Sequence, residues 1–301
     1  MSDKKNLREK NLEMFERRYP NIHVALKDYS PLSALVIDDD GNTDVSFDNQ
    51  SFYQMDAKEF AEQQLEEYWK VPTRFAITPP NPSTLDTYAG PRLFNILSRS
   101  EKAGIEYQLA FADRTSFTLV VLGVGLGYHI NSLVEHTECR AVCFVDVNYE
   151  FLYHSLEIYD WVELDEILEE REGLMRFVVD SNPKNLSLFV RQFIRGSNTA
   201  GLDGLTFFQH HRNAVLNEAR VEVFNGLGLV ISSLGFFYDE TLMLKNIHKN
   251  FHEGNSKYYL RRHDRFPVDA PVFVVGSGPS LDNCLPIIKE NADRAFIISA
   301  G

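Results

Sequence analysis

The stretch FTLVVLGVGLGYHINSLVEH, residues 117–136, is a continuous apolar strand followed by a glycine-rich turn and the start of a helix. RAVCFVDVNYEFLYHSLEIYDWVEL (140–164) repeats the order of buried strand and helix. MRFVVD (175–180), PKNLSLFVRQFIRG (183–196) and GLTFFQ (204–209) continue it with a strand, a helix and a strand. Strands that alternate with helices are typical of a parallel sheet with both faces covered. The sequence therefore predicts an α/β fold built on a Rossmann-like parallel sheet.

An N-terminal α+β segment is predicted before this sheet. Apolar residues at helical spacing indicate a helix at 5–18, and two alternating runs around Asp-Asp-Gly indicate a hairpin at 33–47. Residues 55–70 read as a helix with Asp56 as its N-cap. Residues 71–92 hold five prolines and are interpreted as a connector.

A second unit of strand, helix and strand is predicted after a mostly helical stretch that begins at residue 210. Its elements are APVFVVG (270–276), PSLDNCLPIIKEN (279–291) and RAFIISA (294–300). A chain of 301 residues suits about two domains. We predict an N-terminal segment that packs on the next domain (1–103), a Rossmann-like domain with a helical extension (104–265) and the start of a second Rossmann-like domain (266–301).

Composition excludes several classes of protein. Asp and Glu number 43 against 30 Lys and Arg, so the net charge is −13, which disfavours a nucleic-acid partner. The cysteines Cys139, Cys143 and Cys284 fit no disulfide framework. No stretch approaches the ~20 apolar residues that cross a bilayer, and the N-terminus lacks a signal-peptide core. We therefore expect a cytoplasmic protein without a membrane partner.

The glycine turn of the first strand is a candidate nucleotide-type site. Gly123, Gly125 and Gly127 follow the strand, and Asp146 ends the next strand, where a carboxylate can reach ribose hydroxyls. The spacing G-x-G-x-G is similar to a methyltransferase motif, although Val121 stands where that motif has an acid. A tight turn that binds nothing is the alternative, because such glycine patterns are weak signals.

A second glycine loop, VVGSGPSLD (274–282), also follows an apolar strand. Its two glycines let a backbone approach a phosphate, its serines offer hydroxyl donors, and the helix that follows favours an anion at its N-terminus. The loop is neither a Walker loop nor a dinucleotide fingerprint, since Leu281 replaces the third glycine. A purely structural turn is again the alternative.

The Gly-Ser-Gly-Pro-Ser-Leu loop, with FIISAG (296–301) as the next strand, resembles the motility accessory factor (Maf) family of flagellin glycosyltransferases. VVLGVGLGYHINSL, VCFVDVNYEFL and NLEMFERRYPNI are similar to the amino-terminal part of that family in the same order. The family's central domain is similar to bacterial sialyltransferases and to an archaeal-type pterin pyrophosphokinase that shares the Gly-Pro-Ser-Leu loop.

The resemblance implies an enzyme that transfers a nonulosonic acid, of the pseudaminic or legionaminic acid type, from a CMP-activated donor to Ser/Thr hydroxyls of flagellin. It implies a donor site at Gly276, Ser277, Gly278, Pro279, Ser280, Ser299, Ala300 and Gly301. The family's catalytic domain continues past this strand, so we expect these residues to be part of a longer protein, inactive alone, with catalytic residues beyond Gly301. A divalent cation is compatible with this chemistry, but the sequence shows no committed acidic pair.

Two further readings stay open. The glycine turn at 123–127 and Asp146 would suit a SAM-dependent methyltransferase, and residues 1–265 would suit a non-catalytic flagellin-docking scaffold. His248 and His252 have the i, i+4 spacing of metal ligands, but Lys249 stands between them and no third ligand is evident, so no metal site is predicted. His210 and His211 lie just after a strand, at an edge where polar groups line clefts, and are a weaker ligand candidate.

Overall fold

The computed structural model describes residues 2–76, 89–105, 114–232, 237–253, 271–276, 278 and 280–300. The chain divides into two compact units, Met1–Thr241 and Leu242–Gly301, and each is described by itself. The boundaries that the sequence suggested, after residues 103 and 265, stay predictions.

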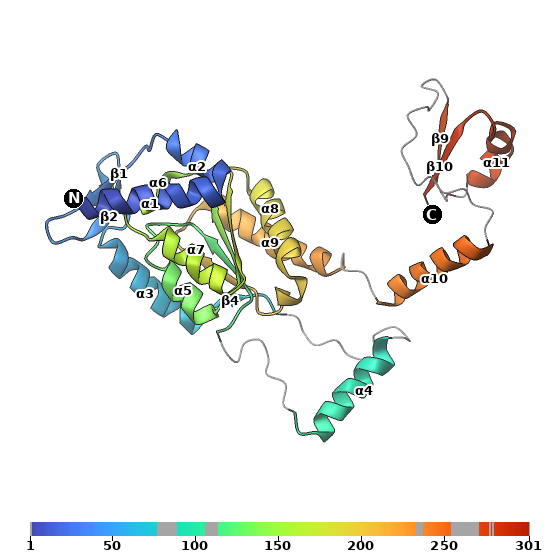
Figure 1. The fold of residues 1–301 in the computed structure, drawn as a ribbon, viewed down its shortest axis with the longest axis horizontal. Coiled ribbons are helices and arrows are strands. Elements are labelled where there is room, and N and C mark those ends of the chain that lie inside the picture. Colours follow the sequence, from blue (N-terminus) through green and yellow to red (C-terminus); the bar gives the residue numbers. More distant parts are fainter. Residues whose placement is uncertain are drawn as a thin grey trace. The chain divides into compact units, whose positions relative to one another are not determined.

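The first unit is built on a five-stranded sheet of order β4-β8-β5-β6-β7 (Figure 1). Four strands are parallel: β5 (Thr118–Leu122), β6 (Ala141–Asp146), β7 (Leu174–Val179) and β8 (Thr206–Gln209). The predicted parallel α/β sheet is thus confirmed. The edge strand β4 (Thr73–Arg74) runs antiparallel to β8, so the first residues of the expected connector belong to the sheet. Two residues of strand are too few to give a period in the sequence.

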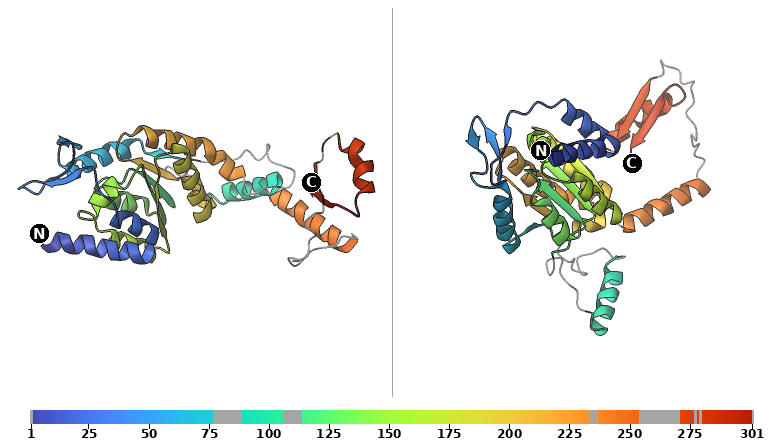
Figure 2. Two further views of the ribbon diagram at one scale, coloured as in Figure 1. Left: turned by 90° about the horizontal axis from the view of Figure 1, so that it is seen from above. Right: turned by 60° about the vertical axis from the view of Figure 1, so that its left-hand side comes forward.

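Helices cover both faces of this sheet (Figures 1 and 2). They are α5 (Ile130–Thr137), α6 (Glu150–Ser155), α7 (Trp161–Glu170), α8 (Pro183–Ser197) and α9 (Ala214–Ser232), with a short 3₁₀ turn, η2 (Thr199–Leu202), before β8. Successive residues of a strand point to opposite faces. Leu119 and Val121 therefore join the core that includes α5 and α7, while Val120 and Leu122 join the core that includes α8 and α9. All five residues of β5 are buried, as expected of a central parallel strand.

The N-terminal segment packs into the same unit. It comprises α1 (Ser2–Arg18), α2 (Pro20–Lys27), β1 (Ala34–Ile37), β2 (Thr43–Phe47), β3 (Gln50–Ser51) and α3 (Ala57–Lys70). The predicted hairpin is confirmed, because β1 pairs antiparallel with β2. Asp56 caps α3 by accepting a hydrogen bond from the backbone N–H of Glu59, also as predicted. Met14 and Phe15 of α1 lie in the core on one face of the sheet.

A buried carboxylate ties this segment to the end of β6. Glu150, at the start of α6, accepts hydrogen bonds from the backbone N–H of Ser33 (2.7 Å), the Ser33 hydroxyl (2.5 Å) and the Tyr29 hydroxyl (2.6 Å). Burial opposes ionisation of this carboxyl group, but these donors outweigh it and lower its pKa. The N-terminal segment is therefore held over the carboxyl edge of the sheet, where the glycine turn at 123–127 and Asp146 lie.

The second unit contains the predicted strand, helix and strand. β9 (Val272–Gly276) pairs in parallel with β10 (Phe296–Ala300), and α11 (Leu281–Glu290) connects them. The described residues also include two further helices, α4 (Ala89–Lys102) and α10 (Phe237–Glu253). None of the helices in the described ranges has the length and apolar character needed to span a bilayer.

Candidate functional site

The glycine turn between β5 and α5 is filled by the protein's own side chains. Gly123, Gly125 and Gly127 have φ of +89°, +55° and +94°, which side chains of L-residues rarely tolerate. A Cβ at Gly123 would lie 2.6 Å from the His211 ring, and one at Gly127 would lie 2.6 Å from Tyr159. A Cβ at Gly125 would collide with His210. Each glycine is therefore required by the local backbone and packing, whatever the turn binds.

Asp146 is used inside the protein. Its carboxylate accepts hydrogen bonds from the backbone N–H of Val124 (3.0 Å) and of Val147 (2.8 Å), and the residue is 1% exposed. Burial raises its pKa, although His211 and the two backbone N–H groups oppose that shift. The carboxylate that would reach a ribose in a Rossmann-like site instead braces the glycine turn.

The crevice at the carboxyl ends of β5 and β8 is also occupied. The chain leaves β5 toward β6 on one side and returns to β8 on the other, so these neighbours form the switch point at which open α/β sheets bind ligands. Here the Tyr53 hydroxyl lies 3.0 Å from Nε2 of His210. The Phe52 ring packs against His211 with 5.7 Å between ring centroids. Residues that follow the N-terminal hairpin thus plug the crevice.

His210 is held as a neutral imidazole by a hydrogen-bond network. Gln64 donates through Nε2 to the backbone carbonyls of Gln209 (3.2 Å) and His210 (2.5 Å), so its Oε1 accepts from Nδ1 of His210 (2.9 Å). With a proton on Nδ1, Nε2 of His210 accepts the Tyr53 hydroxyl proton. Burial lowers the pKa of His210, in agreement with this neutral form.

His129 stacks on His210 with 4.2 Å between ring centroids. It is fully buried, and within the described residues neither of its ring nitrogens has a hydrogen-bond partner. Burial, together with a smaller effect of the neighbouring His211, lowers its pKa to about 3. Burial also lowers the pKa of His211, against the opposing charge of Asp146. The group of side chains that fills the crevice therefore contains three neutral histidines, His129, His210 and His211.

This cluster predicts acid sensitivity. An unfolded histidine takes up a proton near pH 6.5, whereas His129 in the folded chain stays neutral down to about pH 3. Unfolding then binds protons, so stability is fully present above pH 6.5 and is lost as the pH falls toward 3. His129 contributes about 1.4 kcal/mol per pH unit within that window, and the lowered pKa values of His210 and His211 act in the same direction. We expect urea midpoints to fall steadily between pH 7 and pH 4.

His129→Phe is the matched variant for this prediction. A phenyl ring keeps the stack on Phe208 and His210 and removes two unpaired buried nitrogens. The free energy of unfolding should then fall by about 1.4 kcal/mol less per pH unit below pH 6. Asp146 is present in both proteins, so its own titration cancels in the comparison. Equal acid slopes for the two proteins would contradict the assignment.

The second glycine loop, between β9 and α11, is of a different kind. Among the residues that the structure describes, a Cβ at Gly276 would meet no atom within 4 Å, and one at Gly278 would meet the Ser280 hydroxyl at 3.9 Å. Gly276 is not among the described glycines with a positive φ. Ser299 and Ala300 of β10 lie opposite Val275 and Gly276 in the parallel register, so both strands end at the same edge as the loop.

Three of the predicted donor-site residues, Ser277, Pro279 and Gly301, lie outside the described residues. Ser280 precedes α11 and makes no side-chain cap bond to that helix. The ligand role of this loop, and that of the first glycine turn, stay predictions. On α10, the rings of His248 and His252 are 4.4 Å apart, but no group of three metal-ligating side chains occurs within the described ranges.

Comparison with known proteins agrees with this arrangement of two units. Residues 7–232, more than half of the chain, match a family model described as the Glycosyltransferase Maf N-terminal domain. The chain belongs to the Maf glycosyltransferase family. Residues 242–301 match a second model, described as 6-hydroxymethylpterin diphosphokinase MptE-like. The family resemblance seen in the sequence is thereby confirmed.

A solved structure is similar over nearly the whole chain. The MAf glycosyltransferase from Magnetospirillum magneticum AMB-1 is 29% identical, with a TM-score of 0.74, over 99% of this chain and 46% of that protein. The chain thus spans less than half the length of this relative. No curated protein sequence matched.

Sequence reasoning missed the residues that plug the crevice. Tyr53, Gln64 and His129 come from three separate segments, and no local pattern links them. His210 and His211 carried the one available signal, because two histidines directly after a strand lie where a parallel sheet has its binding edge.

Proposed function

We propose that this chain belongs to a glycosyltransferase that transfers a nonulosonic acid from a CMP-activated donor to Ser/Thr hydroxyls of flagellin. In this proposal the loop between β9 and α11 approaches the CMP phosphate, and the first unit serves as a scaffold that docks flagellin. The family match supports glycosyl transfer, and the sequence resemblance is the source of the donor and the acceptor.

The observation that carries the donor site is the contrast between the two glycine loops. Positive φ and close packing explain the glycines at 123, 125 and 127. Among the described residues neither reason applies to Gly276, where a Cβ would meet no atom within 4 Å and φ is not positive. A glycine that the chain's own packing does not require is expected where a ligand backs directly onto the main chain.

In this proposal the loop between β9 and α11 stabilises negative charge on the leaving group. In the transfer, the bond between the anomeric carbon and the phosphate oxygen of CMP breaks, and the Ser/Thr oxygen forms a new bond to that carbon and loses its proton. Negative charge then gathers on the CMP phosphate. Backbone N–H groups and the N-terminus of the ten-residue helix α11 favour an anion at this position. A divalent cation would add to this stabilisation, and the base that takes the hydroxyl proton is not among the residues we assign.

The filled first crevice supports a scaffold role for the first unit over the methyltransferase alternative. SAM would need the space that His210, His211 and Tyr159 occupy and the carboxylate that Val124 and Val147 use. No feature of the described residues favours methyl transfer. The cytoplasm, where CMP-sugars and unassembled flagellin meet, is the proposed location.

The test is the mass of flagellin in cells with and without this protein. Flagellin from the deletion strain is expected to lack the nonulosonic acid, and the cells to be non-motile, with both restored by the intact gene. The purified longer protein that contains these residues should transfer the sugar from its CMP donor to unmodified flagellin and should give no heat with SAM. Fully glycosylated flagellin in the deletion strain would refute the proposal.

A further inference from the structure

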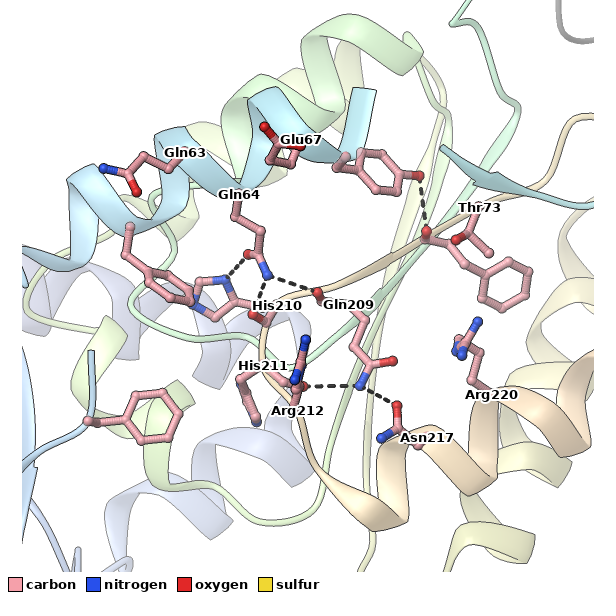
Figure 3. A pocket seen from close by; sticks show the side chains of 14 residues that line it. Gln63, Gln64, Glu67, Thr73, Gln209, His210, His211, Arg212, Asn217 and Arg220 are labelled. Carbon is pink, nitrogen blue, oxygen red and sulfur yellow. Dashed lines mark hydrogen bonds between the residues drawn. The ribbon is translucent and has the colours of Figure 1, made fainter. Parts of the chain in front are cut away.

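A polar cavity in the first unit lies beside the plugged crevice, on the far side of β8 from β5. It has a volume of about 810 Å³ and lies between α3 and α9, with β8 and β4 contributing to its lining (Figure 3). Pockets of about 300–1,000 Å³ are the size that holds a small molecule. The first glycine turn and the donor loop contribute nothing to its lining.

The charged side chains of the lining are unbalanced. Arg212, after β8, and Arg220, on α9, have no ion-pair or hydrogen-bond partner within the described part of the chain, and Nε of Arg220 is buried without a partner. The one acid of the lining, Glu67, is paired with Lys70 at 2.5 Å. Arg212 is exposed and Arg220 is half-buried, so both guanidinium groups are open to a ligand in the cavity. Guanidinium groups suit carboxylate and phosphate ligands, which they can bind with two parallel hydrogen bonds.

The amide side chains around the arginines are pre-positioned. Gln209 donates through Nε2 to Oδ1 of Asn217 (2.8 Å) and to the backbone carbonyl of His211 (3.1 Å), as Figure 3 shows. These bonds fix the orientation of both amides, so the Asn217 NH₂ group and the Gln209 carbonyl oxygen remain for a ligand. Asn217 and Arg220 are three positions apart on α9 and share one face of that helix.

The remaining lining is aromatic and rigid. Phe60 and Tyr68 of α3 are half-buried, and the Tyr68 hydroxyl donates to the backbone carbonyl of Phe207 (3.0 Å), which fixes its ring. Gln64 is fully occupied by His210 and two backbone carbonyls, so it forms a fixed wall. Aromatic rings together with amide groups can contact the apolar and hydroxyl-bearing parts of a sugar ring at the same time.

We propose that this cavity, lined by Arg212, Arg220 and Asn217, binds a saccharide that carries one carboxylate or phosphate group. The anion lies between the two guanidinium groups, and the sugar ring lies toward Phe60 and Tyr68. The proposal does not rest on the proposed function, because the donor loop lies in the second unit.

Binding of three sugars that differ only at C6 tests the proposal. Calorimetry on the full chain should detect glucuronate or glucose 6-phosphate, whichever anion the site prefers, at least tenfold more tightly than glucose. Stronger binding of glucuronate would identify a sugar acid as the natural ligand, and stronger binding of glucose 6-phosphate a sugar phosphate. Acetate and inorganic phosphate should bind more weakly than the corresponding sugars.

The variants Arg212→Gln and Arg220→Gln should each weaken the preferred anionic sugar by about tenfold or more, the usual cost of losing a hydrogen bond to a charged group. Arg195→Gln is the matched control, since Arg195 is exposed on α8 and outside the cavity. It should leave binding unchanged, as should Gly276→Val in the donor loop. Thermal unfolding should be the same for all four proteins.

Several outcomes would overturn the proposal. They are no binding of either anionic sugar at millimolar concentration, equal binding of glucose, equal binding of acetate or inorganic phosphate, and equal weakening by Arg195→Gln. If Gly276→Val abolishes transfer but not sugar binding, the two sites are separate. If the anionic sugars fail to bind while flagellin transfer proceeds, this inference fails and the proposed function stands.

Discussion

Replacing Gly127 with alanine is expected to lower the free energy of unfolding of the first unit by about 2–6 kcal/mol. The residue has φ of +94°, and holding a non-glycine residue in such a conformation costs about 1–3 kcal/mol. The new Cβ would also lie 2.6 Å from Cβ of Tyr159, and overpacking of this kind costs about 1–3 kcal/mol more.

Tyr159 has little freedom to move away. Its ring packs edge-on against Trp161 at 4.9 Å, and its hydroxyl donates to Asn131. Urea unfolding followed by circular dichroism measures the loss. The control is Gly196→Ala on α8, where a Cβ meets no atom within 4 Å and the change should be neutral or stabilising by up to about 1 kcal/mol. An unchanged urea midpoint for Gly127→Ala would mean that the turn relaxes and is not fixed by its packing.

The sequence predicted the parallel sheet because its central strands are buried on both sides. β5 and β6 are mostly apolar runs of the length of a strand, and each is followed by a helix, which is the pattern expected of a parallel α/β sheet. The N-cap of α3 could also be predicted, since it depends only on Asp56 and Glu59, which are close in the sequence. The edge strand β4 was missed because its two residues pair with β8, which lies more than 130 positions later.

Whether the first glycine turn faces a ligand or the protein's own side chains could not be predicted, for a related reason. Gly123, Gly125 and Gly127 look the same in the sequence whether they face a nucleotide or a histidine. The difference depends on His210, His211 and Tyr159, which the fold brings to the turn from 32 or more positions away. Room for a Cβ separates this turn from the donor loop, and that is a property of packing rather than of the motif.

In the longer protein to which we expect these residues to belong, the variant Gly276→Val should reduce kcat/KM for the CMP-sugar at least 100-fold while leaving the fold intact. Gly276 ends β9, where valine is well suited to a strand, and a Cβ there meets no atom of the described residues within 4 Å. If the donor phosphate contacts this backbone, the added methyl groups displace it, and a misplacement of about 1 Å costs on the order of 100-fold in rate.

Transfer to flagellin measured over a range of donor concentrations tests this expectation, with thermal unfolding to check the fold. The matched control is Val274→Thr, because Val274 is 79% exposed on the same face of β9, one pleat farther from the loop, and threonine keeps its shape. It should retain full activity. Comparison with Gly127→Ala separates the two kinds of glycine, because Gly127→Ala should lose stability and Gly276→Val should lose activity. Normal transfer by Gly276→Val would place the donor elsewhere and leave the loop as a structural turn.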